Sequence, residues 1–485
     1  MAKDDSVNIL AQRSFTMADQ NLFASLSGDV NPLHVDEIRA RRTLIGDVAV
    51  HGMHTLLWSI NVLAEQRRSL GNITHIDVRF PKPLHPNELV ALNLTKETPT
   101  ALHLRATVGS KVVAQIKLDI SPSYTAIKQI SADRPPLPPQ KEYPAPQELS
   151  FPSIPGMQGL CPTFTSANDF DRLFPAAANL MGSETLRTLG ACSYLVGIIC
   201  PGAQSIFSRL NVDTDTSLLS MPLSYRVIEA DERFLLVRHK IEGGGLRGEI
   251  EAFAPPPPPR QMSVSDLKLK ISADEFSGQR ALVIGGSRGL GELTSKIIAA
   301  GGGEVALTYA KGKEDAENVA QNLATTRTNT RILRFDVTQD NQAFYEEMAT
   351  FRPTHVYYFA TCQIFRHKSQ AFELERLRTF MAFYVDGFWN LCRHLAGACP
   401  EHKMSIYYPS SVAVAERPPG MTEYAMAKAS GEILCTDMDS LLPKLAVHIQ
   451  RLPRLLTDQT NLVTRQDLSD PVDILLPIYR SMQQS

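Results

Sequence analysis

The sequence has few cysteines and no excess of charge of either sign. Its 485 residues include seven cysteines, none of them in a Cys-x-x-Cys pair. An odd number of cysteines in a long chain is typical of free thiols in a reducing compartment, so we expect no disulfide framework and no zinc or other metal site. Lys and Arg number 49 and Asp and Glu 51, for a net charge of -2. Without a polybasic segment, nucleic acid and anionic membranes are poor partners.

Long apolar runs are absent as well. The longest, around Leu195 to Cys200, is far shorter than the roughly 20 residues that a membrane span requires, and segment 1–15 lacks the apolar core of a signal peptide. Hydrophobic residues at 43% and charged residues at 21% lie near the globular averages, which excludes a disordered, collagenous or coiled-coil chain. We therefore expect a cytoplasmic protein with small-molecule chemistry.

Proline is concentrated in two stretches, at 134–139 and at Pro255–Pro259, where five prolines follow one another. Such runs favour extended polyproline II structure and cannot continue a helix or a central strand, so both are interpreted as spacers. They divide the chain into units of ordinary domain size. The predicted domains are 1–130, 150–254 and 275–485, and the predicted linkers are 131–149 and 255–274.

The third domain alternates short apolar runs with helical stretches, a pattern typical of a parallel sheet built from βαβ units. Its strands are predicted at 281–284, 304–308, 331–335, 356–359, 404–408 and 446–451. The first two domains each have a helical stretch followed by strand-like runs, which is an α+β pattern and suggests a duplicated unit. Their helices are predicted at 52–67 and 184–199, and their strands at 74–80, 88–95, 101–108, 111–120, 218–227, 234–242 and 245–253.

A carboxylate and an imidazole lie close together in segment 26–34, which reads Leu-Ser-Gly-Asp-Val-Asn-Pro-Leu-His. Asp29 and His34 on a short turn can hold one water molecule between two bases, and such a pair can add or remove water. An isolated Asp and His at this spacing are more often a turn cap and a surface residue. The complete string, followed by His-Gly-Met at 51–53, is more specific.

That string resembles the signature of the MaoC-like, (R)-specific enoyl-thioester hydratases, which have the hot dog fold, over about residues 13–122. The resemblance implies that Asp29 and His34 activate the water and that Asn31 orients the loop. It also implies that the backbone N–H of Gly52 polarises the thioester carbonyl, since a helix N-terminus favours a developing oxyanion. Two further histidines, His51 and His54, lie outside the matching catalytic positions and are interpreted as structural.

Segment 150–254 is similar to a second hot dog domain, through Leu-Gly-Ala-Cys-Ser-Tyr at 189–194 and the strands that follow 205–207. It has no Asp-x-Asn-Pro-x-His string, so we expect it to lack a water-activating pair of its own. Hot dog domains usually act in pairs with the acyl tunnel at their junction. Two interpretations stay open, a degenerate partner that completes the tunnel and a stabilising half without substrate contact.

A glycine-rich loop, Gly-Gly-Ser-Arg-Gly-Leu-Gly at 285–291, follows the predicted strand 281–284 and precedes a helix. Glycines there let the backbone approach a pyrophosphate at the helix N-terminus. The strand at 304–308 is followed by no acid before Glu314, whereas Arg288 and Lys311 can meet a 2′-phosphate, which favours NADP(H) over NAD(H). The cofactor-binding residues expected here are Gly285, Ser287, Arg288, Gly289, Leu290, Gly291 and Lys311.

Tyr424 and Lys428 lie one helical turn apart on one face, and Ser411 precedes Tyr424 by thirteen residues. Together with the glycine loop, this set resembles the short-chain dehydrogenase/reductase family over about residues 278–485. The resemblance implies that Tyr424 is the acid–base, that Lys428 lowers its pKa and holds the ribose, and that Ser411 binds the carbonyl oxygen. It also assigns Asp336 to adenine contact and matches Pro453 and Thr457 to the segment beside the nicotinamide.

Three parts of the sequence depart from that family. Tyr-Phe-Ala-Thr at 358–361 stands in place of Asn-Asn-Ala-Gly, Tyr384 in place of the Asn of the proton relay, and Arg454 in place of the glycine after Pro453. Because the relay Asn is missing, proton transfer could be slowed while Ser411, Tyr424 and Lys428 are all present.

The expected fold is multidomain, an α+β double hot dog followed by an α/β Rossmann-type doubly wound parallel sheet. The expected function is that of a bifunctional enzyme that interconverts 3-oxoacyl, (3R)-hydroxyacyl and trans-2-enoyl thioesters with NADPH. Its substrate would be carried by coenzyme A or a separate acyl carrier, and a homo-oligomer is one option. The alternatives are a hydratase with a nucleotide-binding scaffold domain, which Tyr384 and Thr361 favour, and a non-catalytic assembly protein in which both sites are relics.

Overall fold

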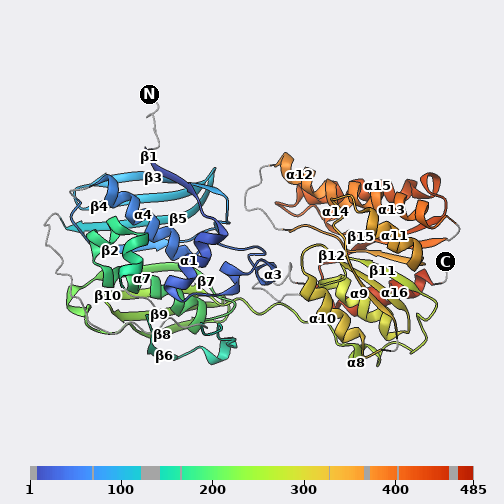
Figure 1. Ribbon diagram of the computed structural model, residues 1–485, viewed down its shortest axis with the longest axis horizontal. Helices are drawn as coiled ribbons and strands as arrows, with labels where there is room; N and C mark the ends of the chain where they lie inside the picture. The colour runs from blue at the N-terminus through green and yellow to red at the C-terminus, as the bar shows by residue number, and fades with distance from the viewer. Residues whose placement is uncertain are drawn as a thin grey trace. The chain divides into compact units, whose positions relative to one another are not determined.

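The structure, a computed structural model, describes residues 8–67, 70–121, 143–163, 167–326, 328–364, 372–400, 403–457 and 468–483. They form two compact units, and the boundary between Pro257 and Pro258 falls inside the predicted proline spacer (Figure 1). The other proline-rich stretch, at 134–139, lies outside the described residues. Within the described ranges, no helix is long and apolar enough to cross a membrane.

The first unit is built on a ten-stranded sheet with the order β1-β3-β4-β5-β2-β7-β10-β9-β8-β6. From either outer edge inward, the strands follow the order first, third, fourth, fifth, second of that half. The two halves thus repeat one topology and join where β2 pairs antiparallel with β7. The strands are β1 (Asn8–Ser14), β2 (Asn72–Arg79), β3 (Leu89–Thr98), β4 (Ala101–Val108), β5 (Lys111–Ser121), β6 (Gln158–Leu160), β7 (Ile206–Thr214), β8 (Ser224–Asp231), β9 (Leu236–Gly243) and β10 (Leu246–Phe253).

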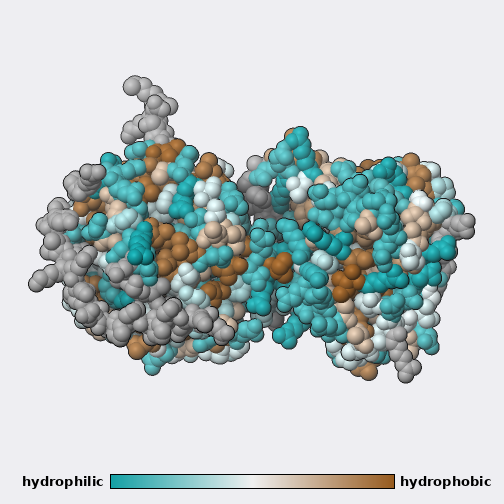
Figure 2. All heavy atoms as spheres, in the orientation of Figure 1, coloured by the Kyte–Doolittle hydropathy of each residue, from teal (hydrophilic) through white to brown (hydrophobic). Residues whose placement is uncertain are grey.

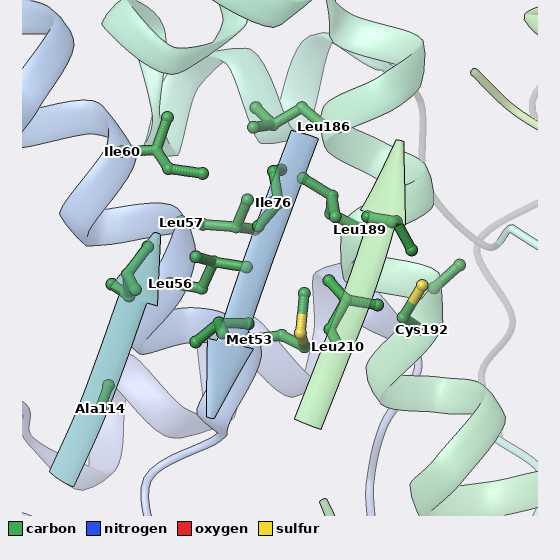
Figure 3. Packing of buried hydrophobic residues seen from close by; sticks show 14 of the residues in the cluster. Met53, Leu56, Leu57, Ile60, Ile76, Ala114, Leu186, Leu189, Cys192 and Leu210 are labelled. Carbon is green, nitrogen blue, oxygen red and sulfur yellow. The ribbon is translucent and has the colours of Figure 1, made fainter. Parts of the chain in front are cut away.

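Each half carries one long helix between its first and second strands, α4 (Gly52–Gln66) and α7 (Ser183–Tyr194), the latter continuing as the π-helix η2 (Leu195–Ile199). Every residue from Met53 to Leu63 is buried, as expected of a helix at the centre of a core. Figure 3 shows α4 and α7 facing each other over β2, β5 and β7. The shorter helices are α1 (Met17–Ser27), α2 (Pro32–Val35), α3 (Glu37–Ala40), α5 (Ala167–Leu173) and α6 (Pro175–Met181).

One predicted strand of this unit is wrong. Residues 218–227 do not form a continuous strand, because Thr216–Leu218 is a 3₁₀ turn and β8 begins only at Ser224. The Asp215 carboxylate accepts the N–H of Ser217 at 2.9 Å and fixes the turn, and a proline at 222 has no N–H to offer a sheet. Three strands of this unit, the edge strands β1 and β6 and the central strand β7, are absent from the strand ranges predicted from the sequence.

The second unit is a six-stranded parallel sheet with the order β13-β12-β11-β14-β15-β16, which confirms the doubly wound prediction. The strands are β11 (Arg280–Ile284), β12 (Glu304–Tyr309), β13 (Thr330–Arg334), β14 (His355–Tyr358), β15 (Met404–Ser411) and β16 (Leu445–Leu452). The strand order reverses between β11 and β14, and ligands of such folds bind at the carboxyl ends of the strands there.

Helices cover both faces of this sheet (Figure 1), with one hydrophobic core on each face. They are α8 (Val264–Leu267), α9 (Gly289–Ala300), α10 (Lys313–Leu323), α11 (Gln342–Phe351), α12 (Leu374–Met381), the π-helix η4 (Ala382–Asp386), α13 (Gly387–Ala398), α14 (Ala413–Glu416), α15 (Thr422–Leu441) and α16 (Pro471–Met482). Figure 2 shows hydrophilic residues over much of the described surface of each unit in this view, with hydrophobic residues in small patches.

Candidate active sites

The loop that carries Asp29 lies between α1 and α2. Gly28 ends α1 in the left-handed conformation, with φ of 79°, and so turns the chain. Asn31 then caps α2 by accepting the N–H of Leu33 at 3.0 Å. This short helix presents His34 toward the side chain of Asp29, which is itself only 1% exposed as a residue. The local sequence thus brings the two predicted bases together.

Asp29 and His34 face each other across a short gap, with Oδ2 of the carboxylate 4.0 Å from Nε2 of the imidazole. The other ring nitrogen, Nδ1, lies 2.6 Å from the carbonyl oxygen of Ala49. A carbonyl oxygen can only accept, so Nδ1 of the neutral ring carries the hydrogen and Nε2 a lone pair. A water molecule between Nε2 and Oδ2 can donate one hydrogen bond to each base. This is the arrangement that activation of water needs.

The electrostatic setting of Asp29 balances burial against hydrogen bonds. Burial raises the pKa of the carboxyl, while His34, the hydroxyl of Ser193 and the N–H of Asn31 lower it. A buried carboxylate is stable only where such partners face it. Burial is the largest of these effects, so the pKa of Asp29 is raised overall above its ordinary value, as suits a group that takes up and releases a proton.

His51 belongs to this site, although the sequence alone places it outside. Its ring stacks on that of His34, with the centroids 3.9 Å apart, and its Nε2 lies 3.0 Å from the carbonyl oxygen of Asp29. Nδ1 lies 3.0 Å from Oε1 of Gln20, which also accepts the backbone N–H of His51. Burial lowers the pKa of His51 well below its usual range. His51 thus lines the site beside His34 and Asp29, because the turn before α4 folds back onto the Asp29 loop.

Gly52 and His54 lie where the sequence predicts. Gly52 is the first residue of α4, and a Cβ there would lie 3.0 Å from the ring of Phe80. Its position at the N-terminus of a 15-residue helix suits the predicted role of its N–H as a carbonyl donor. His54 packs at 4.7 to 4.8 Å from the rings of Phe15 and Phe23, which is a structural environment.

The second half of the first unit also reaches the Asp29 loop, through α7 and η2. The tunnel interpretation of 150–254 allows such a contribution, but the sequence predicts none of the individual contacts with Asp29 and Asn31. Oγ of Ser193, on α7, donates to Oδ2 of Asp29 at 2.6 Å. Nδ2 of Asn31 donates to the carbonyl oxygens of Gly197 at 2.8 Å and Gly202 at 3.2 Å. A Cβ on Gly197 would lie 2.2 Å from Oδ1 of Asp29. One signal in the sequence could have indicated these contacts. Ser193 and Gly197 lie four residues apart, and so on one face of an apolar helix, where a glycine lowers helix stability and can mark a close packing contact.

In the second unit, the glycine loop connects β11 to α9 at the reversal of strand order. Gly285 and Gly289 take positive φ angles of 75° and 57°. A Cβ on Gly291 would lie 2.2 Å from the carbonyl oxygen of Gly285, whereas a Cβ on Gly289 would meet nothing within 4 Å. Open space before the N-terminus of the 12-residue helix α9 fits a phosphate group of a dinucleotide.

The other predicted cofactor residues lie in this loop or beyond the carboxyl ends of other strands of the sheet. Ser287 is buried and Leu290 half-buried in the loop and the start of α9, and Arg288 is the residue before that helix. Lys311 is exposed just after β12. Asp336 follows β13 and accepts the N–H and the hydroxyl of Thr338 at 3.0 and 2.7 Å. Thr457 lies half-buried after β16.

Ser411, Tyr424 and Lys428 meet at the carboxyl end of β15. Ser411 is the last residue of that strand, not a residue beyond it, because the parallel pairing with β16 continues to Leu452. Tyr424 and Lys428 lie on the buried face of α15, with exposures of 8% and 6%. The pKa of Tyr424 is raised to about 12, because the effect of burial exceeds the lowering that a hydrogen bond with Ser411 contributes.

Tyr384 changes the surroundings of Lys428. Nζ of Lys428 lies 3.9 Å from the ring centroid of Tyr384 and donates to the carbonyl oxygen of Pro409 at 2.7 Å. The hydroxyls of Tyr384 and Thr361 are 2.5 Å apart, so two of the departures from the family pattern contact each other. Tyr408 donates its hydroxyl to the carbonyl oxygen of Tyr384 at 3.0 Å. The ammonium group is thus covered by an aromatic ring where the family has an amide.

The burial of Lys428 predicts a pH-dependent stability for the second unit. Burial lowers its pKa to about 7 from 10.5, so the unfolded chain binds more protons than the folded chain between those values. Lys428 therefore destabilises the folded state most below about pH 7. As pH rises from there toward 10, the free energy of unfolding increases by at most about 1.4 kcal/mol per pH unit. We expect Lys428→Met to stabilise the protein most near neutral or lower pH and progressively less above it.

Urea unfolding of the full chain at several pH values measures this difference. Lys313→Met is the matched control, because the side chain of Lys313 is 69% exposed on α10. A difference between Lys428→Met and the parent that does not vary with pH would contradict a depressed pKa for Lys428.

Comparison with known proteins matches both parts of the chain. A family model described as "MaoC like domain" matches residues 2–115, and one described as "short chain dehydrogenase" matches residues 279–466. Protein MaoC of Klebsiella aerogenes is 30% identical over 97 residues, which are 20% of this chain. The match covers 29% of that protein, so it spans less than a third of its length.

Two solved structures are similar to the second unit. A putative short chain dehydrogenase from Escherichia coli CFT073, complexed with NADPH, is 18% identical with a TM-score of 0.39, and the match covers 44% of this chain and 92% of that one. A short chain dehydrogenase from Burkholderia cenocepacia J2315, in complex with NADP, is 21% identical with a TM-score of 0.36, and the match covers 43% and 91%.

The matches confirm both resemblances that the sequence suggests. The chain joins a MaoC-like domain to a short-chain dehydrogenase domain on its C-terminal side.

Proposed function

We propose that this chain interconverts 3-oxoacyl, (3R)-hydroxyacyl and trans-2-enoyl thioesters, by hydration or dehydration in its first unit and by NADPH-dependent reduction in its second. The observation that carries the proposal is the pair of buried Asp29 and half-buried His34, whose Oδ2 and Nε2 atoms lie 4.0 Å apart. The (3R)-hydroxyacyl thioester is the compound that both reactions share. Its carrier would be coenzyme A or a separate acyl carrier.

The hydration step follows from the positions of the two bases. Asp29 and His34 hold a water molecule, and one base takes a proton as the water oxygen bonds to C3 of the enoyl thioester. A proton is then delivered to C2, so the net change is the addition of one water across the double bond. The N–H of Gly52 stabilises the enolate oxygen that forms at the thioester carbonyl. Dehydration is the same path in reverse.

We infer that the two halves of the first unit are a pair of hot dog domains, of which the second is catalytically degenerate. The repeated strand order and the equivalent positions of α4 and α7 support this inference. The contacts of Ser193 and Gly197 with Asp29 favour a half that contributes to the site over one that only stabilises it.

The second unit fits a dinucleotide, since the glycine loop leaves room for a phosphate at the start of α9. NADPH, when bound, supplies the hydride. Ser411 and Tyr424 would then bind the carbonyl oxygen of the 3-oxoacyl group, and Tyr424 would give it a proton. Lys428 would hold the ribose and favour the ionised phenol.

A second candidate function is a hydratase whose C-terminal domain binds the nucleotide but reduces slowly or not at all. The ring of Tyr384 over Nζ of Lys428 favours it, together with the raised pKa of Tyr424. Two assays on the full chain separate the candidates. Hydration of a trans-2-enoyl thioester tests the first unit, and loss of NADPH absorbance with a 3-oxoacyl thioester tests the second. Binding of NADPH without its oxidation, at every chain length and with either carrier, would select the second candidate.

Cofactor choice gives a further prediction. Arg288→Ala should weaken NADPH binding roughly tenfold or more while NADH binding changes little, because only NADPH carries the 2′-phosphate that a guanidinium can bind in bidentate fashion. Lys311→Ala should act in the same direction with a smaller effect, since Lys311 is exposed. Titration of protein fluorescence with each cofactor measures both. An equal loss for NADPH and NADH would show that Arg288 shapes the loop and does not read the 2′-phosphate.

A further inference from the structure

We propose that Ser193, which comes from the half of the first unit without an Asp–His pair, is a positioning residue of the hydratase site. Its hydroxyl group orients the carboxylate of Asp29 toward the water and keeps it ionised. The inference rests on the proposed hydratase function and assigns a residue that neither the Asp29 string nor the start of α4 contains.

Two donors fix the plane of the Asp29 carboxylate. The hydroxyl of Ser193 donates to Oδ2 at 2.6 Å, and the backbone N–H of Asn31 donates to Oδ1 at 3.2 Å. Hydrogen bonds to an ionised acceptor are short and roughly twice as strong as neutral ones. With one donor on each oxygen, the carboxylate cannot rotate freely, and Oδ2 also faces Nε2 of His34 at 4.0 Å.

The backbone around Ser193 is shaped for this contact. Ser193 lies near the end of α7, just before the helix widens into the π-helix η2, and π-bulges occur frequently at functional sites. Four residues on, Gly197 leaves the space that Asp29 occupies, since a Cβ there would lie 2.2 Å from Oδ1. The Gly197 carbonyl also accepts Nδ2 of Asn31 at 2.8 Å. One helix end thus contacts both Asp29 and Asn31, where apolar packing alone would need no hydroxyl.

The charged and titratable groups around Asp29 make the hydroxyl important. Nε2 of His34, on α2, and Nε2 of His51, before α4, lie 4.0 and 3.9 Å from Oδ2. Tyr194, on α7, also interacts with Asp29, and the two groups repel each other when both are ionised. Burial disfavours the charged carboxylate, so loss of the Ser193 donor raises the pKa of Asp29 further. The base is then protonated, and inactive, up to a higher pH.

The test is Ser193→Ala in the full chain, assayed for hydration of a trans-2-enoyl thioester across pH. We expect kcat to fall on the order of tenfold to a hundredfold with little change in KM, since a hydrogen bond to a charged group is lost. The acidic limb of the kcat/KM profile should move to higher pH by roughly one unit or more. Ser193→Thr keeps the hydroxyl and should restore the limb, and Ser193→Cys, with a weaker donor, should fall between.

Ser59→Ala is the matched control, because Ser59 is also fully buried on a core helix and donates to the carbonyl oxygen of Thr55 at 2.7 Å. It should leave the acidic limb in place. If Ser193→Ala leaves the limb unmoved, or lowers the rate no more than Ser59→Ala does, the positioning role is wrong. Carbon-13 NMR titration of the Asp29 carboxyl, identified by its loss in Asp29→Asn, gives a readout without activity. A higher pKa in Ser193→Ala would support the contact even if the parent hydrates no thioester, which would refute the proposed function alone.

Discussion

Asp29→Asn in the full chain should lower the rate of enoyl-thioester hydration by roughly 10²-fold or more, and His34→Ala should do the same. The amide of asparagine keeps the shape of the carboxylate but cannot take a proton from water. Alanine removes the lone pair on Nε2 that lies 4.0 Å from Oδ2 of Asp29. NADPH binding and any reductase activity should stay at the level of the parent, because the two sites share no residue.

Asp36→Asn is a matched control for Asp29→Asn. Asp36 caps α3 by accepting the N–H of Ile38 at 2.9 Å, so its replacement perturbs a neighbouring turn by a similar change in charge. Hydration should persist in that variant. Parent-like hydration in Asp29→Asn, or loss of both activities in a folded Asp29→Asn protein, would refute the assignment of Asp29 as a base of this site.

The second large effect concerns the reductase. Tyr424→Phe should lower the rate of 3-oxoacyl-thioester reduction by roughly 10²-fold or more, because the only proton donor proposed for the carbonyl oxygen is removed. Phenylalanine keeps the ring that packs edge-on against Phe380 and Tyr384, with centroids 5.6 and 5.7 Å away. NADPH affinity should therefore hold. Stopped-flow oxidation of NADPH measures the first quantity and fluorescence titration the second.

Tyr384→Asn is the informative companion of Tyr424→Phe. It removes the ring that lies 3.9 Å from Nζ of Lys428 and restores the amide that the short-chain dehydrogenase resemblance expects. Tyr384 is 1% exposed, so the smaller side chain leaves a cavity that costs about 3 kcal/mol or more of stability. If the parent binds NADPH without oxidising it and Tyr384→Asn gains turnover, the hydratase with a scaffold domain is the correct function of the natural chain. If the parent reduces well and the variant does not, Tyr384 is part of a working site.

The parts of the molecule that follow from local sequence could be predicted. The βαβ alternation of the second unit predicts its parallel sheet, because short apolar runs indicate buried strands and apolar residues every three to four positions indicate helices. Asp29, Asn31 and His34 are close in sequence, so a single turn brings them together. The same holds for Tyr424 and Lys428 on one face of α15. Their assignment needed no knowledge of tertiary structure.

The parts that depend on distant contacts could not be predicted. Ser193 and Asp29 are 164 residues apart, and neither segment contains a sequence pattern that predicts their contact. His51 enters the site because the chain before α4 folds back onto the Asp29 loop, which its position before Gly52 does not reveal. The partners of Tyr384 depend on the π-helix η4, where Tyr408 binds the carbonyl oxygen of Tyr384. Such bulges change the register of a helix by one residue and leave no periodic signal.

The repeated strand order of the first unit bears on how its site can be inherited. A symmetric pair of identical copies would present the same loop and the same helix end twice, and so would hold two equivalent catalytic centres. Here one half retains Asp29 and His34, while the other lends Ser193 and Gly197 to them. Under the proposed assignment, the two halves therefore contribute different residues to one centre. We then expect a substitution at Ser193 in the second half to lower the same hydratase activity as a substitution at Asp29 in the first.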